Sequence, residues 1–411
     1  MGKDYRSLSM AAVAEIRPVP SGPAGSPTAR AFGDNREFEL LLACCEYISR
    51  AERVRALLWH GLNWERLLAL VDHHRVVPQI YGELSTYPHL VPAELLDTLR
   101  SRYRDNARKT LWFRAELVRI VSHLESAGIK AVPYKGPVLA QALYGAVTQR
   151  QFGDLDILIL PADVPKAKAA LRDLGYKSAL ELAPQIEATY IETGYEYSFG
   201  STHGQSLLEL QWRIVPRFYS IDFDVAELFD RAGEITFGER SVRSLCAEDL
   251  LLVLSVHAAK HVWVQLSWLC DIAQLAKSRQ LDWNAIQREA CRLGIERIVN
   301  LNLFLAHKLL GSPLLPAIEM RVREDPSTTV LADEILAIIE NSTHYNTESI
   351  PYFRLMMRLR ERWQDRARFL WRLAITPSLS EWSIVRLPKH LQPLYRLVRL
   401  SRLAKRLACS E

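Results

Sequence analysis

Residues 135–160 read KGPVLAQALYGAVTQRQFGDLDILIL, and this stretch decides the fold class. Its first part predicts a short helix, because Pro137 lies near the first helical position and Gly145 just past the last. Its last part, DLDILIL, is a dense β-forming run that predicts a buried strand. Successive side chains of a strand point to opposite faces, so Asp154 and Asp156 share one face and the apolar residues line the other.

Asp154 and Asp156 form a candidate site for a divalent cation. Alternate residues of a strand lie roughly 6–7 Å apart, so both carboxylates can approach one hard cation. Two acids at the start of an otherwise apolar strand are unfavourable unless their charges meet metal or water. The structural alternative is a solvated Asp-x-Asp pair on a surface strand.

A second predicted strand carries a third acid. Residues 206–212 read SLLELQW, in which Glu209 is the only acid, and the preceding run YEYSF (195–199) predicts a hairpin with it. If this strand pairs beside DLDILIL, Glu209 joins Asp154 and Asp156 in a cluster of three carboxylates. Such clusters hold Mg²⁺ against the oxygens of a triphosphate. The alternative for Glu209 is a solvated strand acid.

The start of the short helix is a candidate phosphate site. The first N–H groups of a helix and the positive end of its dipole bind phosphate, and Lys135 and Gly136 open this helix. Arg150, ahead of the Asp-x-Asp strand, is a further candidate cation for a triphosphate. The alternative for Arg150 is a salt bridge to a nearby acid.

The order of these motifs resembles the DNA polymerase β-type nucleotidyltransferase superfamily. Within it, the segments YKG, ALYG, R-x-x-x-DLDILI and ELQW are similar to a less characterised bacterial branch of nucleotidyltransferase family proteins. The resemblance continues in HAAKHVWVQLSWLCDIAQL (257–275) and TPSLSEWSIVRLPKHLQPLYRLVRLSRL (376–403). Three positions depart from the usual pattern: Pro137 stands in place of Ser, Glu209 in place of Asp, and Gln211 where the branch often carries His.

The resemblance implies a metal-dependent enzyme that transfers a nucleoside monophosphate from an NTP and releases pyrophosphate. Asp154, Asp156 and Glu209 would be the catalytic and metal-binding residues for Mg²⁺ or Mn²⁺, with Glu209 as third ligand or as base for the acceptor hydroxyl. The resemblance favours an acceptor hydroxyl on a small molecule, sugar, peptide or protein in a biosynthetic pathway, rather than on nucleic acid. The alternative is a non-catalytic nucleotide-binding or scaffold protein that retains the fold.

The nucleotide site implied by the resemblance comprises Lys135, Gly136 and Arg150, and ATP is the expected nucleotide.

A histidine-rich helix is expected to contribute the acceptor pocket. His257 and His261 lie four residues apart and share a helix face with Lys260 nearby. The HExxH pattern of zinc enzymes is absent, so packing or substrate contact is the favoured interpretation over a zinc site. Asp271 is expected either to orient one of these imidazoles or to cap a turn.

The chain is expected to be an α+β protein, with a small mixed β-sheet core flanked by helical regions. Its predicted parts are a disordered leader (1–35), an N-terminal helical region (36–127), a nucleotidyltransferase core (128–246), a second helical region (247–350) and a basic amphipathic tail (351–411).

The charge of the chain is uneven. The net charge is +5, but residues 351–411 hold 14 Lys and Arg against 4 Asp and Glu, which leaves the other residues at a net charge of −5. We expect the tail to pack on this acidic body, with Trp363, Leu370 and Leu373 inward, whereas an RNA-binding tail is the alternative.

The chain carries neither an uninterrupted apolar run of about 18 residues nor an apolar signal core. Its six cysteines include no Cys-x-x-Cys pair. A cytoplasmic protein without a membrane span is therefore expected.

Overall fold

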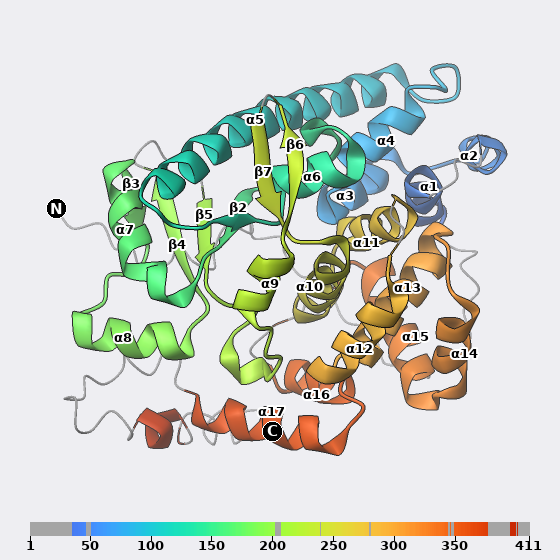
Figure 1. Cartoon of the computed structure of the whole chain (residues 1–411). Coiled ribbons are helices and arrows are strands. Elements are labelled where there is room, and N and C mark those ends of the chain that lie inside the picture. Colours follow the sequence, from blue (N-terminus) through green and yellow to red (C-terminus); the bar gives the residue numbers. More distant parts are fainter. Residues whose placement is uncertain are drawn as a thin grey trace.

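The computed structural model describes residues 35–46, 51–201, 207–238, 240–278, 281–343, 346, 349–376, 395–399 and 401. Its central feature is a sheet in the order β1-β2-β5-β4-β3 (Figure 1). The strands are β1 (Val132–Pro133), β2 (Asp154–Leu158), β3 (Tyr176–Ser178), β4 (Glu196–Ser201) and β5 (Leu207–Gln211). Strands β2 and β5 are parallel and the other neighbours antiparallel, so the sheet is mixed, as predicted. The helices within this part are α6 (Gly136–Tyr144), α7 (Val164–Asp173), α8 (Pro184–Thr193) and α9 (Val225–Arg231).

One face of the sheet is apolar and fully covered. Leu155 and Ile157 of β2 and Leu208 and Leu210 of β5 have no exposed surface. They share a core with residues of α7 and of the long helix α5 (Ala93–Ser126), which crosses the sheet (Figure 1). Burial of each such side chain stabilises the fold by about 1.5–3 kcal/mol. The strand alternation therefore leaves the acids of β2 and β5 on the opposite face.

Helices precede the first strand, as the pattern of residues 36–127 predicts. They are α1 (Arg36–Cys45), α2 (Ala51–Leu58), α3 (Trp64–His74), α4 (Val77–Leu84) and α5. The chain breaks between α3 and α4 at Arg75, whose backbone is left-handed with a φ of 54°. Pro78 then lies in the first turn of α4, where the missing N–H has no intrahelical partner to lose.

A second helical region and the tail follow the core. The helical region comprises α10 (Ala247–Lys260), α11 (Leu266–Ser278), α12 (Trp283–Leu293), α13 (Glu296–Leu310), α14 (Pro316–Glu324) and α15 (Pro326–Glu340), and the tail contributes α16 (Ile350–Arg358) and α17 (Trp363–Ile375). The helical region packs in one core cluster with α1 and α3, and buried His74 of α3 accepts a hydrogen bond from the backbone N–H of Leu266 (3.2 Å). This contact gives His74 a structural role.

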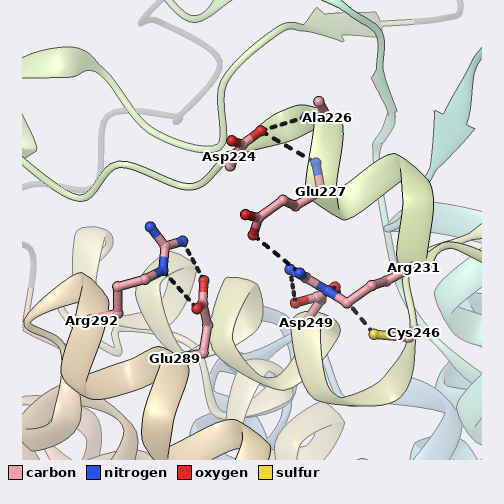
Figure 2. A network of polar contacts seen from close by, with 8 residues as sticks. All are labelled: Asp224, Ala226, Glu227, Arg231, Cys246, Asp249, Glu289 and Arg292. Carbon is pink, nitrogen blue, oxygen red and sulfur yellow. Dashed lines mark hydrogen bonds and ion pairs between the residues drawn. The ribbon is translucent and has the colours of Figure 1, made fainter.

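An ion-pair network joins the core to the second helical region (Figure 2). Arg231 of α9 donates to both carboxylate oxygens of Asp249 in α10, at 2.9 and 3.0 Å, and to Glu227 at 3.2 Å. The Cys246 thiol donates to the same Asp249 carboxylate (3.2 Å). Since the Asp249 side chain is buried, these contacts compensate the cost of desolvating it.

A two-stranded hairpin extends the core beyond the predicted strands. It consists of β6 (Gly233–Phe237) and β7 (Arg240–Ser244), which pair antiparallel, and β7 lies against β1. The sequence pattern did not predict this hairpin.

The orientation expected for α17 is wrong for two of its three residues. Leu373 is buried, but Trp363 is 71% exposed and Leu370 is 50% exposed. The buried stripe instead runs through Phe369, whose ring lies 4.7 Å from the guanidinium carbon of buried Arg360. The helix is amphipathic as expected, but it packs on a different stripe.

Some predictions concern residues that are not described. The leader falls there except for Asn35, whose side chain caps α1 by accepting from Phe38 N (3.3 Å). The segment 376–403 and the end of the basic tail also lie largely outside the described residues. Within the described part of the chain, every helix is too short or too polar to cross a membrane.

Candidate active site

The two predicted acidic strands are neighbours in the sheet. Parallel strands β2 and β5 pair Asp156 with Glu209 directly, and Asp154 lies two residues earlier on the same face. Asp156 is buried, whereas Asp154 and Glu209 are partly exposed. The structure thus brings the three predicted carboxylates together on one face of the sheet.

Lys135 binds one of these carboxylates directly. Its Nζ lies 2.7 Å from Asp156 Oδ1, and both side chains are largely buried. Burial opposes the charged ammonium, but the Asp156 carboxylate overrides this effect and raises the pKa of Lys135. Lys135, which the sequence assigns to phosphate, is therefore the counter-ion of Asp156 in this arrangement.

Gly136 places the start of α6 against strand β2. Its φ is +55°, and a Cβ there would stand 3.0 Å from the backbone oxygen of Asp154. Glycine alone adopts this conformation freely and permits so close an approach. The first N–H groups of α6, which lack a side-chain cap, consequently lie beside Asp154.

Gln211 and Glu196 extend the cluster. The Gln211 amide donates to Asp156 (3.3 Å), Glu209 (3.1 Å) and Glu196 (3.2 Å), and its oxygen accepts from the Tyr134 hydroxyl. Glu196 lies opposite Gln211 in the β4–β5 pairing. A single neutral amide therefore links three carboxylates, and Glu196 is a site residue that the sequence analysis missed.

The electrostatics of the cluster favour a cation. Burial and the neighbouring Asp156 raise the pKa of Asp154. Burial, Glu196 and Asp156 raise the pKa of Glu209 to about 9. Lys135 is the residue that opposes both shifts most strongly. Carboxylates that resist ionisation together gain most from a further positive charge.

The oxygen donors of this cluster have the chemistry that Mg²⁺ or Mn²⁺ prefers. Within the described residues, no three His, Cys, Asp or Glu side chains are grouped closely enough to enclose an ion as they stand. Lys135 and Gln211 already engage Asp156, and Gln211 also engages Glu209. The donor set fits a divalent cation, and binding it would require these two side chains to release carboxylate oxygens.

A cavity of about 440 Å³ opens over the carboxylates. The histidine-rich helix lines its other side, with His257, Lys260 and His261 all facing the space. The rings of His257 and His261 lie 4.7 Å apart, and each packs on Trp268 at 5.3 and 5.4 Å. Burial first, and nearby cations second, lower the pKa of both imidazoles, so they are neutral at pH 7.

Lys260 occupies the part of the cavity nearest β4. Its ammonium lies 5.0 Å from the centre of the Tyr195 ring. Burial lowers the pKa of Lys260, and Glu196 opposes that shift. The three predicted acceptor-pocket residues therefore border the same cavity as the carboxylates.

Arg150 forms the salt bridge that was its alternative interpretation. It donates to Asp271 through Nε (2.9 and 3.0 Å) and Nη2 (2.8 Å), and both side chains are buried. Tyr144 donates to the same carboxylate (2.9 Å). Asp271 thus orients Arg150 rather than an imidazole, although Arg150 still borders the cavity.

Arg75 is a second cavity residue without a sequence signal. It is exposed at the α3–α4 junction and lines the cavity from the N-terminal helices.

The two missed residues differ in how predictable they were. The register of the 195–212 hairpin would have indicated Glu196, because Glu196 faces Gln211. The position of Arg75 depends on helix packing, which local patterns do not encode.

Comparison with known proteins gives one family match. A model of the family described as uncharacterised nucleotidyltransferase matches residues 60–311. Among solved structures, the solution structure of the antibiotic-resistance factor ANT(2'')-Ia matches with 15% identity and a TM-score of 0.28, covering 52% of this chain and 99% of that chain. No curated protein matches.

Proposed function

The chain belongs to the family of uncharacterised nucleotidyltransferases, and from this premise we propose that it transfers a nucleoside monophosphate from an NTP to an acceptor hydroxyl. The acceptor oxygen attacks the α-phosphorus, the bond from that phosphorus to the bridging oxygen breaks, and pyrophosphate leaves. The proposed acceptor is a small molecule, sugar, peptide or protein, and the nucleotide to test first is ATP. The reaction proposed is cytoplasmic and dependent on Mg²⁺ or Mn²⁺.

Asp154 and Asp156, with Glu209, would hold the divalent cation. The cation would supply positive charge to the triphosphate oxygens. The observation that carries this assignment is the direct pairing of Asp156 with Glu209 on adjacent parallel strands, with Asp154 on the same face. The raised pKa of Asp154 and Glu209 supports it, because an added cation favours the ionised forms.

The residues around the carboxylates have separate proposed roles. The start of α6 at Gly136 binds the triphosphate through its N–H groups, with Lys135 as the cation beside it. Arg150 adds positive charge at the same end of the cavity while it stays paired with Asp271. Glu209 acts either as the third metal ligand or as the base that takes the proton of the acceptor hydroxyl.

The acceptor is proposed to enter beside α10. His257, Lys260 and His261 border the cavity opposite the sheet, and the neutral imidazoles offer one donor and one acceptor each. This environment suits a polar hydroxyl-bearing acceptor. The proposed structural units remain those expected from the sequence, with residues 128–246 as the catalytic core between two helical regions.

The test is transfer of label from α-labelled NTPs in the presence of Mg²⁺ or Mn²⁺, together with pyrophosphate release, across a panel of acceptors. Asp154→Asn and Asp156→Asn should abolish transfer, and EDTA should do the same to the unchanged protein. Asp173→Asn is the matched control, because this exposed residue ends α7 outside the cavity. Transfer that survives both cavity substitutions would refute the site, and nucleotide binding without any transfer would favour the scaffold alternative.

A further inference from the structure

The cations that the sequence assigns to the triphosphate already have carboxylate partners. Lys135 is paired with Asp156 and Arg150 with Asp271. A triphosphate brings several negative charges to a cavity whose sheet face is acidic. Cations near the start of α6 that lack a carboxylate partner would favour triphosphate binding further.

Arg75 is one such cation. It borders the cavity, is exposed to solvent, and has no ion pair within the described part of the chain. Its backbone φ of 54° is uncommon for a residue with a side chain. This left-handed conformation ends α3, and such backbone strain is often found at functional sites.

Lys109 of α5 is the second cation. Its Nζ lies 3.7 Å from the position that a Cβ on Gly153 would occupy, and Gly153 directly precedes Asp154. Lys109 also lacks an ion-pair partner among the residues described, and its ammonium lies 5.7 Å from the centre of the Phe113 ring. The charge is thus held beside the segment against which Gly136 packs.

Hydrogen bonds join the neighbours of both cations to the segment before β2. The N–H of Val77, two residues after Arg75, donates to Gln151 Oε1 (2.8 Å). Asn106, one helical turn before Lys109, donates to the backbone oxygens of Thr148 (3.1 Å) and Arg150 (3.4 Å). The segment leading into β2 is therefore bonded to the neighbouring parts of both helices that carry these cations.

The electrostatics of Lys109 agree with this placement. Desolvation and the charge of Arg75 lower the pKa of Lys109, and the carboxylate of Asp154 opposes that shift. Arg75 lines the cavity, and Lys109 lies beside Gly153, so both cations flank the segment that leads into Asp154.

We propose that Arg75 and Lys109 bind the β- and γ-phosphates of the NTP, as a polyphosphate clamp contributed by the N-terminal helices. This inference rests on the proposed nucleotidyl transfer. The clamp lies on the Asp154 side, next to the start of α6, whereas Lys260 lies near Tyr195 and Glu196. The phosphates would consequently extend from α6 toward α3 and α5, and the acceptor would enter beside α10.

The experiment measures the binding of Mg²⁺–ATP and of inorganic tripolyphosphate by titration calorimetry on the full-length protein. Arg75→Met and Lys109→Met should each weaken both ligands roughly tenfold or more, because each removes a charge-assisted contact. Each should also reduce the dependence of affinity on salt. Arg75→Lys should retain part of the affinity, which a purely structural role of the charge would not predict.

Arg108→Met is the matched control. Arg108 is adjacent to Lys109 on α5, carries the same charge, and has a side chain that is 81% exposed and paired with Asp105 (3.5 Å). Its substitution should leave both affinities unchanged. Thermal unfolding of every variant should match the wild type, since both clamp residues are exposed.

Two outcomes separate the clamp from the proposed function. If the wild type transfers nucleotide while Arg75→Met and Lys109→Met bind tripolyphosphate as it does, the clamp is refuted and the function stands. If the wild type binds neither ATP nor tripolyphosphate, both fail.

Discussion

Replacing Arg150 by methionine tests whether a buried ion pair or a phosphate contact is its main role. The guanidinium makes three hydrogen bonds of 2.8–3.0 Å to Asp271, and the Asp271 side chain is 1% exposed. Arg150→Met leaves that carboxylate buried with the Tyr144 hydroxyl as its remaining side-chain donor in the described structure. Loss of one partner of a buried ion pair costs about 3–5 kcal/mol, so the free energy of unfolding should fall by that amount.

Urea unfolding, followed by tryptophan fluorescence, measures this change. Asp271→Leu should be destabilising to a similar extent, because it leaves the arginine charge unpaired. The double variant, Arg150→Met with Asp271→Leu, should recover most of the loss, with about 1 kcal/mol missing for the hydrogen bond of Tyr144. A cost below about 1 kcal/mol for Arg150→Met, or a double variant as unstable as the single ones, would refute the reasoning.

The stable double variant also reports on nucleotide binding. If its affinity for Mg²⁺–ATP equals that of the wild type, Arg150 acts by fixing α11 against the segment before β2. If the affinity falls while stability is restored, the phosphate contact proposed for Arg150 is supported. Stability and affinity thus separate two roles that the single substitution would confuse.

Three further substitutions test other parts of the structure. Gly136→Ala should weaken NTP binding while the protein stays folded. The new Cβ would lie 3.0 Å from the backbone oxygen of Asp154, and the positive φ would cost about 1–3 kcal/mol. Wild-type affinity in titration calorimetry would contradict this. Burial lowers the pKa of His74 from 6.5 to about 3, so between these pH values the unfolded chain binds a proton that the folded chain does not. The contribution of His74 to stability is therefore complete above pH 6.5 and falls as the pH drops toward 3. Urea unfolding of His74→Gln should show a flatter pH profile, and an unchanged profile would exclude His74 as its source. Trp263→Phe should cost about 1–3 kcal/mol in urea unfolding, because the buried Asn302 oxygen loses its indole donor (2.8 Å), whereas Trp363→Phe on the surface should cost little; equal effects would argue against the buried bond.

The site was predictable from the sequence where it depends on strand geometry. Alternation along DLDILIL places Asp154 and Asp156 on one face in any extended strand, and the one acid in SLLELQW is Glu209. The helix start at Gly136 was also predictable from local sequence, because proline and glycine have local conformational preferences. The structure confirms these placements because neighbouring residues determine them.

The partners of these residues were less predictable, because they come from distant segments. Arg150 and Asp271 are 121 residues apart, and the alternatives offered for both remained open until the helices were placed. The stripe of α17 illustrates the same limit: Trp363 and Leu370 are as apolar as Phe369, and only the packing of Phe369 on Arg360 selects the buried side. Local periodicity predicts that a helix is amphipathic, whereas tertiary contacts decide which residues it buries.

The extent of the family match agrees with the architecture of the cavity. The described residues that line it run from Arg75 to Trp268, and all fall within the matched residues 60–311. Helices α14 to α17 lie beyond the match, and none of their described residues lines the cavity. The cavity therefore needs both helical regions, since Arg75 comes from the first and His257 from the second, while the sheet supplies the carboxylates between them. An isolated core of residues 128–246 would keep Asp154, Asp156 and Glu209 but lose the cationic and histidine-bearing sides, so the complete cavity needs the matched region rather than the sheet alone.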